Sequence, residues 1–211
     1  MKNKISFLLL IFIGLAFSSC EKYLGGASVG GDPSPMADEG TTFSAYATNI
    51  DGVSKMEAMV TSGKAGVATL KGSALVTNTR LKSILSNIPE LKVDGDEVTA
   101  EGIQFKNTSK GIESVKGLDP GIIVKYDSKV GDTYKIDGSN EVREVVSKSI
   151  DDDYPYGFMN IKVMKIEEKT NKKGVKSINY WANHKWGLVG IEFIFDDGSS
   201  AKFPILCSTN N

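Results

Sequence analysis

The sequence is poor in the residues on which most catalytic and metal sites depend. Its 211 residues include a single histidine, His184. Zinc sites built from several histidines are therefore excluded, and a Ser/His/Asp triad is possible only around that residue. The pairs Gly138-Ser139 and Gly198-Ser199 are typical of hairpin turns and form no phosphate-binding loop. We expect no cofactor and no metal, and the sequence favours a protein without catalytic activity.

Long apolar runs are also scarce, and the one that stands out lies near the N-terminus. Two lysines precede a mainly apolar run, Ile5–Phe17, and small residues follow it up to Cys20. The run is too short to span a bilayer as a helix, which takes about 20 apolar residues. It predicts a cleaved export signal over residues 1–19. An ordinary secretory signal cut near Ser18 is the alternative, in which Cys20 has no special role.

The segment Ser18-Ser19-Cys20 resembles the lipobox of bacterial lipoproteins, in which a small residue precedes the cysteine that is acylated. The resemblance implies that Cys20 becomes the first residue of the mature protein and carries three acyl chains, palmitate among them. One chain holds a protein only marginally, whereas two or more give a stable anchor. We therefore expect a membrane lipoprotein at the outer membrane, on its periplasmic or its surface face.

Cysteine is otherwise nearly absent. With Cys20 acylated, only Cys207 is left, so no disulfide forms within the chain. A leftover thiol in an exported protein is either reactive or paired between molecules in many cases. Because Cys207 follows the apolar segment Phe203–Leu206, we expect instead a buried and inert side chain.

An excess of charge of one sign is lacking as well, since 25 Lys and Arg residues stand against 26 Asp and Glu residues. Nucleic-acid binding needs a basic stripe on the surface. The one basic cluster lies within Lys169–Lys176, where we expect a solvated turn. The sequence therefore predicts no nucleic-acid partner, and we expect a monomer.

Composition divides the rest of the chain in two. Residues 20–40 are rich in Gly, Ser and Pro, and such a segment buries too little apolar surface to fold. They predict a flexible tether with a span of about 25 Å. Residues 41–211 form one β-rich domain, because a domain of about 150 residues already buries most of its unfolded surface.

Hydrophobic periodicity predicts helices near the start of this domain and strands after it. Apolar residues recur every three or four positions over Thr41–Ser62, which favours a helix. A clearer helix covers Leu81–Ile88, with candidate caps in Thr77–Thr79 and a stop at Pro89. Between them, Gly66–Thr77 is typical of an extended segment. The expected strands after the second helix are Leu91–Val93, Glu97–Phe105, Ile122–Tyr126, Thr133–Ile136, Val142–Ile150, Phe158–Glu168, Val175–Trp181, Leu188–Phe195 and Ala201–Leu206.

Turns with Asp-Gly pairs separate several of these strands, and such pairs favour tight hairpins. The predicted fold is α+β and mainly β, a curled antiparallel meander sheet packed on one or two N-terminal helices. Within Phe158–Glu168, Ile161 and Val163 lie on one face while Met164 and Ile166 lie on the other. This pattern predicts a bulge or burial on both faces of the strand.

Alternate turns of a meander lie at the same end of the sheet, which brings two segments together here. They are Asp151–Tyr156 and Asn183–Trp186. The candidate ligand-binding residues are Asp152, Asp153, Tyr154, Tyr156, Asn183, His184 and Trp186. Aromatic rings beside carboxylates and amides suit a sugar or another small polar ligand. In the alternative interpretation the rings close the end of the sheet and the aspartates form a solvated turn.

Three motifs carry a resemblance in the second half of the chain: Val130–Tyr134, Val145–Ser149 and Ala182–Gly190. With them, the stretch Val130–Ile205 resembles a group of uncharacterised exported lipoproteins of Bacteroides-type bacteria. The group implies no known activity. The chain is more loosely similar to half-barrel lipoprotein-carrier folds, in which an open antiparallel sheet curls over helices. That similarity concerns architecture alone.

Three functions stay open at this point. The first is a non-catalytic binding module tethered to the envelope, for a glycan or for a partner in an envelope complex. The second is a carrier of lipid or another hydrophobic ligand, which needs an apolar cavity between sheet and helix. The third is a hydrolase that uses two carboxylates of the rim, which requires them to converge across a cleft.

Overall fold

The computed structural model of the chain describes residues 28–45 and 52–209. The expected signal peptide over residues 1–19 and the acylated Cys20 lie outside the described residues, as do residues 21–27 of the expected tether. Among the described residues, no helix is long and apolar enough to cross a membrane.

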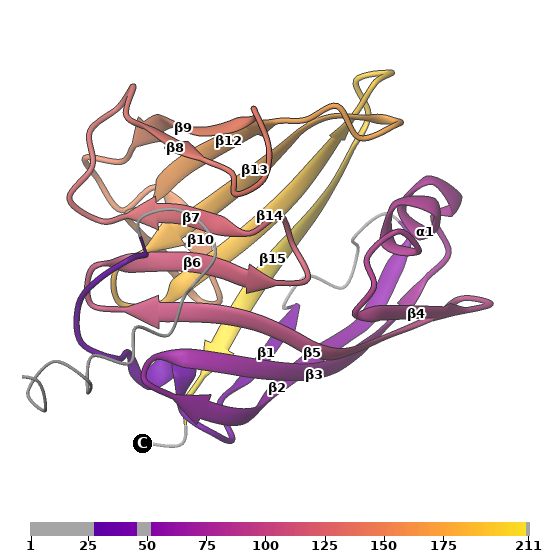
Figure 1. Ribbon diagram of the computed structural model, residues 1–211, viewed down its shortest axis with the longest axis horizontal. Helices are drawn as coiled ribbons and strands as arrows, with labels where there is room; N and C mark the ends of the chain where they lie inside the picture. The colour runs from indigo at the N-terminus through magenta and orange to yellow at the C-terminus, as the bar shows by residue number, and fades with distance from the viewer. Residues whose placement is uncertain (1–27, 46–51, 210–211) are drawn as a thin grey trace, which may run out of the picture.

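The described chain folds into a nearly closed, barrel-like antiparallel sheet of 13 strands (Figure 1). Its strands are β1 (Thr42–Ala45), β2 (Val53–Lys64), β3 (Val67–Val76), β4 (Leu91–Asp94), β5 (Glu97–Thr108), β6 (Gly111–Lys116), β7 (Gly121–Lys125), β8 (Thr133–Lys135), β9 (Val142–Lys148), β12 (Met164–Lys169), β13 (Val175–Asn183), β14 (Gly187–Phe195) and β15 (Ser200–Ser208). The other elements are a short 3-10 helix η1 (Pro35–Ala37), an α-helix α1 (Thr79–Leu85) and a separate hairpin of β10 (Tyr154–Tyr156) and β11 (Met159–Ile161).

Most neighbours in the sheet are consecutive in the chain, so the sheet is largely a meander. Its order is β7-β6-β5-β3-β2-β1-β15-β14-β13-β12-β9-β8, with β4 added beside β5. The pairing of β1 with β15, from Thr42 opposite Ser208 to Ala45 opposite Ile205, joins the two halves. The expectation of a mainly β, curled antiparallel sheet is thus confirmed.

The expected helical support differs from the structure. The described chain has one α-helix, and it follows β3 instead of preceding the sheet. This helix is the predicted one: it begins after Asn78, whose Oδ1 accepts a hydrogen bond from Leu81 N at 3.0 Å. Leu81 and Ile84 belong to the main core. The helix α1 that carries them lies at one end of the barrel (Figure 1).

The helix expected over Thr41–Ser62 is wrong where the structure describes this segment, because β1 and β2 occupy it. Bulges explain the misleading spacing. The register of β2 against β3 shifts between Ser54 and Glu57 and again between Val60 and Ser62. Each extra residue turns the two-residue period of a strand into an apparent spacing of three. Periodicity alone then resembles that of a helix.

The later strands agree better with the sequence. The extended segment before the helix is β3, and the strands expected from Leu91 onward all appear. The long strand expected over Phe158–Glu168 is divided into β11 and β12, which was not expected. The expected burial on both faces is confirmed, since Ile161 and Val163 belong to one apolar cluster and Met164 and Ile166 to another. Strand β6 was not expected. Its Glu113 and Ser114 are buried, which hides the alternation by which strands are recognised.

A buried arginine closes the seam where the two ends of the sheet approach each other. Arg143 on β9 donates from Nε to Glu168 Oε2 at 2.7 Å and from Nη1 to the carbonyl oxygens of Gly121 and Ile122, both at 3.2 Å. Tyr180 OH donates to the same carboxylate at 2.9 Å. The guanidinium group of Arg143 therefore binds backbone carbonyl oxygens of β7, the strand at one end of the sheet order.

Part of the expected tether is folded onto the barrel. Ser28 Oγ and Val29 N both donate to Glu113 Oε2 at 2.9 Å, and Ser34 N donates to Asn107 O at 3.1 Å. The 3-10 helix η1 follows and buries Met36. Residues 28–40 thus differ from a free linker, because η1 packs across the end of the barrel opposite α1.

Candidate functional site

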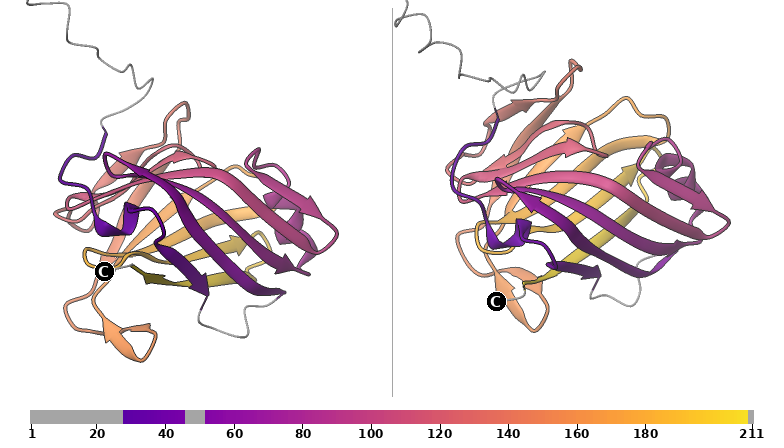
Figure 2. Two further views of the ribbon diagram at one scale, coloured as in Figure 1. Left: turned by 90° about the horizontal axis from the view of Figure 1, so that it is seen from below. Right: turned by 60° about the horizontal axis from the view of Figure 1, so that its bottom comes forward.

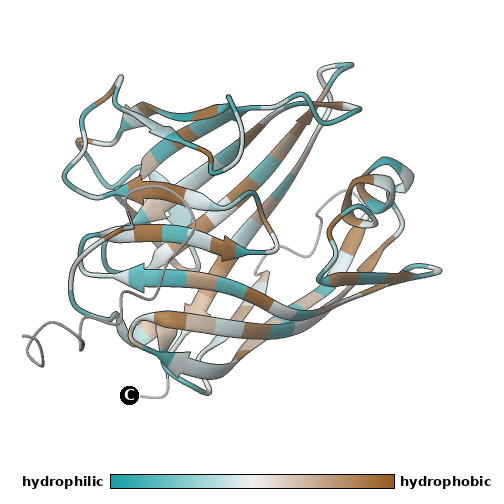
Figure 3. Ribbon diagram, in the orientation of Figure 1, coloured by the Kyte–Doolittle hydropathy of each residue, from teal (hydrophilic) through white to brown (hydrophobic). Residues whose placement is uncertain are grey.

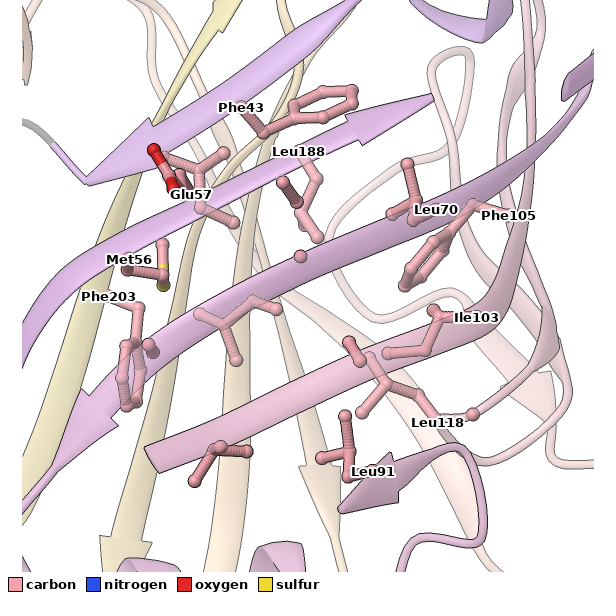
Figure 4. Close-up of a pocket in the computed structure, with 18 of the residues that line it drawn as sticks. Phe43, Met56, Glu57, Leu70, Leu91, Ile103, Phe105, Leu118, Leu188 and Phe203 are labelled. Carbon is pink, nitrogen blue, oxygen red and sulfur yellow. The ribbon is translucent and has the colours of Figure 1, made fainter. Parts of the chain in front are cut away.

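The interior of the barrel contains an apolar cavity of about 290 Å³ (Figure 4). Its walls come from β2, β3 and β5 on one side and from β14 and β15 on the other, with α1 and η1 at its two ends. Most side chains labelled in Figure 4 come from these facing walls and surround the space between them, and Phe43 of β1, Leu91 of β4 and Leu118 after β6 complete the lining.

Small residues in the wall explain why the cavity exists. Alternate residues of a strand share one face, and on β3 the inward face carries Ala68, Leu70, Gly72, Ala74 and Val76. Three of these five positions hold alanine or glycine. Ala58 and Ala100 continue this surface on the neighbouring strands. Larger side chains at the alanine positions would reduce the space, whereas at Gly72 a Cβ atom would lie 2.5 Å from the backbone oxygen of Glu57 on β2.

Large apolar side chains of the wall are only half-buried although they point inward. They include Leu70, Phe105, Leu188, Ile191 and Phe203. In a close-packed core such residues touch neighbours on all sides. For comparison, an engineered apolar cavity of about 150 Å³ binds benzene. The space in this barrel is about twice as large, so it can hold a larger apolar molecule.

The two ends of the cavity differ in their access to solvent. At the η1 end, Met36, Ala68 and Asn107 are all buried. At the α1 end, Leu85 and Leu118 are half-buried. The wall follows β5 from Val98 to Asn107, a distance of about 30 Å at the usual rise of a strand. The cavity is therefore elongated, closed at η1 and more accessible at α1.

The wall of the cavity contains few polar side chains, among them Asn107 and Glu57. Asn107 is at the closed end, and its Oδ1 has no hydrogen-bond partner among the described residues. Glu57 is the one charged residue that lines the cavity in the described chain, and it is exposed. A single carboxylate provides no acid and base pair. The cavity can bind apolar surface, and the described residues of its wall include no second carboxylate.

Of the rim predicted from the sequence, the structure brings Tyr156 and Trp186 together, and the aromatic rings there are packed. Tyr154 and Tyr156, on the β10–β11 hairpin, are 7% and 3% exposed. The Tyr156 ring lies 5.2 Å from that of Trp186, and the Tyr154 ring lies 6.0 Å from that of Trp181. With Val189 these rings form a second apolar cluster on the outer face of β13 and β14. The rings of this cluster are thus packed against neighbouring side chains. Trp186 is half-buried at its edge.

Hydrogen bonds hold this outer cluster in place. Tyr156 OH accepts from Cys207 N at 3.1 Å, and Tyr154 OH donates to Val189 O at 3.4 Å. Asn183 shapes the β13–β14 turn, since its Oδ1 accepts from Trp186 N at 3.0 Å and its Nδ2 donates to Lys162 O at 2.7 Å. Asn183 thus has a structural role in the turn.

The charged members of the predicted rim face solvent. Asp152, Asp153 and His184 are exposed, and Asp153 accepts a hydrogen bond from Ser149 Oγ at 2.7 Å. Within the described part of the chain, no group of three or more His, Cys, Asp or Glu residues could hold a metal ion. Binding of a sugar or polar ligand at this rim stays a prediction.

Two titrating groups lie beside the outer cluster. Burial raises the pKa of the Cys207 thiol to about 11, and this cysteine is buried as expected. Partial burial also lowers the pKa of Lys202; the carboxylate of Glu192 opposes this shift, and the nearby Lys165 adds to it. The Lys202 ammonium lies 4.2 Å from the centre of the Trp181 ring, which is a cation–π contact at an exposed residue.

The residues of the cavity were missed from the sequence. A signal existed in the inward face of β3, where small residues alternate with outward polar ones. Small residues in a strand do not by themselves distinguish a cavity from close packing against a large partner. The bulges of β2 made this strand resemble a helix in the sequence, so its part of the wall beside β3 was also missed.

Comparison of the chain with protein-family models, with curated proteins and with solved structures found no match, so its fold and site are described by their own geometry.

Proposed function

We propose that this protein binds an elongated apolar molecule, such as a lipid or a compound with an alkyl chain, inside its barrel-like sheet. The observation that carries the proposal is the apolar cavity of about 290 Å³ between the two walls of the barrel. The sequence left a hydrophobic-ligand carrier open on the condition of such a cavity. Among the described residues, the wall of the cavity is almost wholly apolar and includes a single carboxylate, which supports binding of an apolar molecule.

Energetics support occupancy of the cavity. An empty closed cavity in a core costs about 24 cal/mol per Å³. Because this cavity is accessible at the α1 end, that cost applies to only part of its volume. A ligand that fills the space recovers this loss. Each methylene group that it buries contributes about 0.8 kcal/mol.

The expected lipid anchor fits this activity. An acylated Cys20 would hold the folded domain within a few tens of ångströms of a bilayer, since about eight residues separate it from the folded chain at Ser28. A bilayer is a source of and a destination for apolar molecules. The proposal thus describes a binding module of the envelope, with a hydrophobic ligand in place of the glycan first expected.

Filling the cavity tests the proposal. We expect the wild-type protein to raise the fluorescence of N-phenyl-1-naphthylamine, a neutral apolar dye, with saturable binding. Ala100 faces the cavity from β5, so Ala100→Phe should weaken dye binding by about tenfold or more, with little loss of stability. Thr99→Phe is the matched control, because Thr99 lies on the opposite face of the same strand.

The outcome is decided by the two variants together. Dye binding that is absent in the wild type, or equally strong in Ala100→Phe and Thr99→Phe, would contradict a ligand site inside the barrel.

A further inference from the structure

We propose that Asn107 selects the ligand by accepting a hydrogen bond from a neutral donor, such as a hydroxyl group, at the ligand's buried end. This inference rests on the proposed function and adds the chemical class of the ligand: an alkyl chain that ends in a hydroxyl group and enters with that group first.

The position of Asn107 carries the first step. On β5, Ile103, Phe105 and Asn107 alternate on the inward face, and all three line the cavity. Asn107 is 8% exposed and lies at the closed end, beside Met36 of η1. The last position of an otherwise apolar row is therefore an amide.

The side-chain amide is poorly satisfied, whereas the backbone of the same residue is not. Asn107 N donates to Gly66 O at 2.8 Å, and Asn107 O accepts from Ser34 N at 3.1 Å. Its Oδ1 has no partner within the described chain. Its Nδ2 lies 3.8 Å from the Met36 sulfur, a weak acceptor. A buried carbonyl without a partner is unfavourable, and a ligand donor would relieve it.

The side chains of Asn107 and Met36 occupy the space next to Gly187. At Gly187, whose φ is +69°, a Cβ atom would lie 2.9 Å from Asn107 Nδ2 and 2.8 Å from the Met36 sulfur. Any side chain there would displace both groups. Met36 is unbranched and flexible, so its thioether can shift to let a ligand reach the amide oxygen. The closed end is thus built around one amide with a movable neighbour.

The charges around this end favour a neutral group over a carboxylate. Lys106, the adjacent residue, lies on the opposite face, where its Nζ donates to Ser28 Oγ at 2.8 Å. Among the described residues that line the cavity, the one charge is the carboxylate of Glu57. A buried carboxylate without a cation is strongly unfavourable. A hydroxyl group meets no such penalty and can donate to Oδ1.

A second asparagine provides a matched control. Asn179 on β13 is also buried, and its Oδ1 also has no partner within the described chain. Its Nδ2 donates to Glu192 Oε2 at 3.1 Å, and it does not line the cavity. The two residues share their chemistry and burial and differ in access to the ligand.

The test compares three ligands of equal chain length in displacing N-phenyl-1-naphthylamine: decan-1-ol, its methyl ether and decanoate at neutral pH. In the wild-type protein we expect decan-1-ol to bind about five- to tenfold more tightly than the ether, which cannot donate. Decanoate should bind more weakly than the alcohol. Asn107→Leu should remove the difference between alcohol and ether, and Asn179→Leu should preserve it.

The outcomes separate this inference from the proposed function. Equal affinities of alcohol and ether for the wild type, or a preference that survives Asn107→Leu, overturn the role of Asn107 and leave the apolar site in place. If neither the dye nor any of the three ligands binds, both proposals fail. Should Asn107→Leu not fold, the wild-type comparison of alcohol and ether decides alone.

Discussion

Strands β13 to β15 have two apolar faces, and the two are packed in opposite ways. On the outer face, the β10–β11 hairpin presses Tyr154 and Tyr156 against Trp181 and Val189, all of which are buried. On the inner face, Leu188 and Phe203 are half-buried beside a cavity. Apolar residues on the same strands therefore stabilise the fold on one side and leave space for a ligand on the other.

The partner of each face causes this difference. The outer face meets aromatic side chains, which bring large rings into contact. The inner face meets the small residues of β3, such as Gly72 and Ala74. Figure 3 shows hydrophobic bands on both walls of the barrel, so hydropathy alone does not reveal which face is full. The volume of the opposing side chains decides it.

The largest effect should follow from breaking the packed face. Trp181 is 9% exposed and contacts the Tyr154 ring and the Lys202 ammonium. We expect Trp181→Ala to lower the free energy of unfolding by about 3 to 5 kcal/mol, because it leaves a cavity in a dry cluster. Urea denaturation followed by circular dichroism measures this. A loss below about 1 kcal/mol would show that the outer cluster is not close-packed.

A neighbouring pair of residues sharpens the comparison within one strand. Val189 faces the outer cluster and is fully buried, while Leu188 faces the cavity and is half-buried. We expect Val189→Ala to cost about 2 kcal/mol. Leu188→Ala should cost only about 1 kcal/mol, because part of its surface is already outside the packed interior.

We expect the two substitutions to rank in the opposite order in their effect on ligand binding. Leu188→Ala should weaken dye binding, and Val189→Ala should leave it unchanged in the folded protein. Denaturation and dye titration of both variants check this. Equal effects of the two substitutions on both quantities would argue that the faces are alike.

The smallest effect is expected at the tip of the hairpin. Figure 2 shows that the β10–β11 hairpin projects from the body, and Phe158 at its turn is 96% exposed. Phe158→Ser should change the free energy of unfolding by no more than about 0.5 kcal/mol. A loss of more than 1 kcal/mol in urea denaturation would show that the tip packs on the barrel in solution.

The sequence predicted those parts of the fold in which local chemistry agrees with tertiary structure. Asn78 caps α1 as expected, and the strands from Leu91 onward appear, because Asp-Gly turns and alternating β-branched residues fix them locally. The meeting of Tyr156 with Trp186 followed from the meander, since alternate turns share an end. The sequence pattern did not predict whether these rings are exposed or packed, because that depends on how the β10–β11 hairpin that carries the tyrosines lies against the sheet.

The cavity could not be predicted, because it is a property of two walls that are distant in sequence. Ala68 and Phe203 line the same space from opposite halves of the chain. The β1–β15 pairing that brings the halves together depends on long-range backbone hydrogen bonds. The bulged register of β2 also disguised one of the walls as a helix. The bulges of β2 therefore account both for the helix wrongly expected over Thr41–Ser62 and for part of the missed cavity wall.

The junction of β1 with β15 also protects the barrel from association with other chains. Without β15, both β1 and β14 would present a row of unpaired backbone groups, and such open edges invite pairing with another chain. The last strand therefore covers two edges at once.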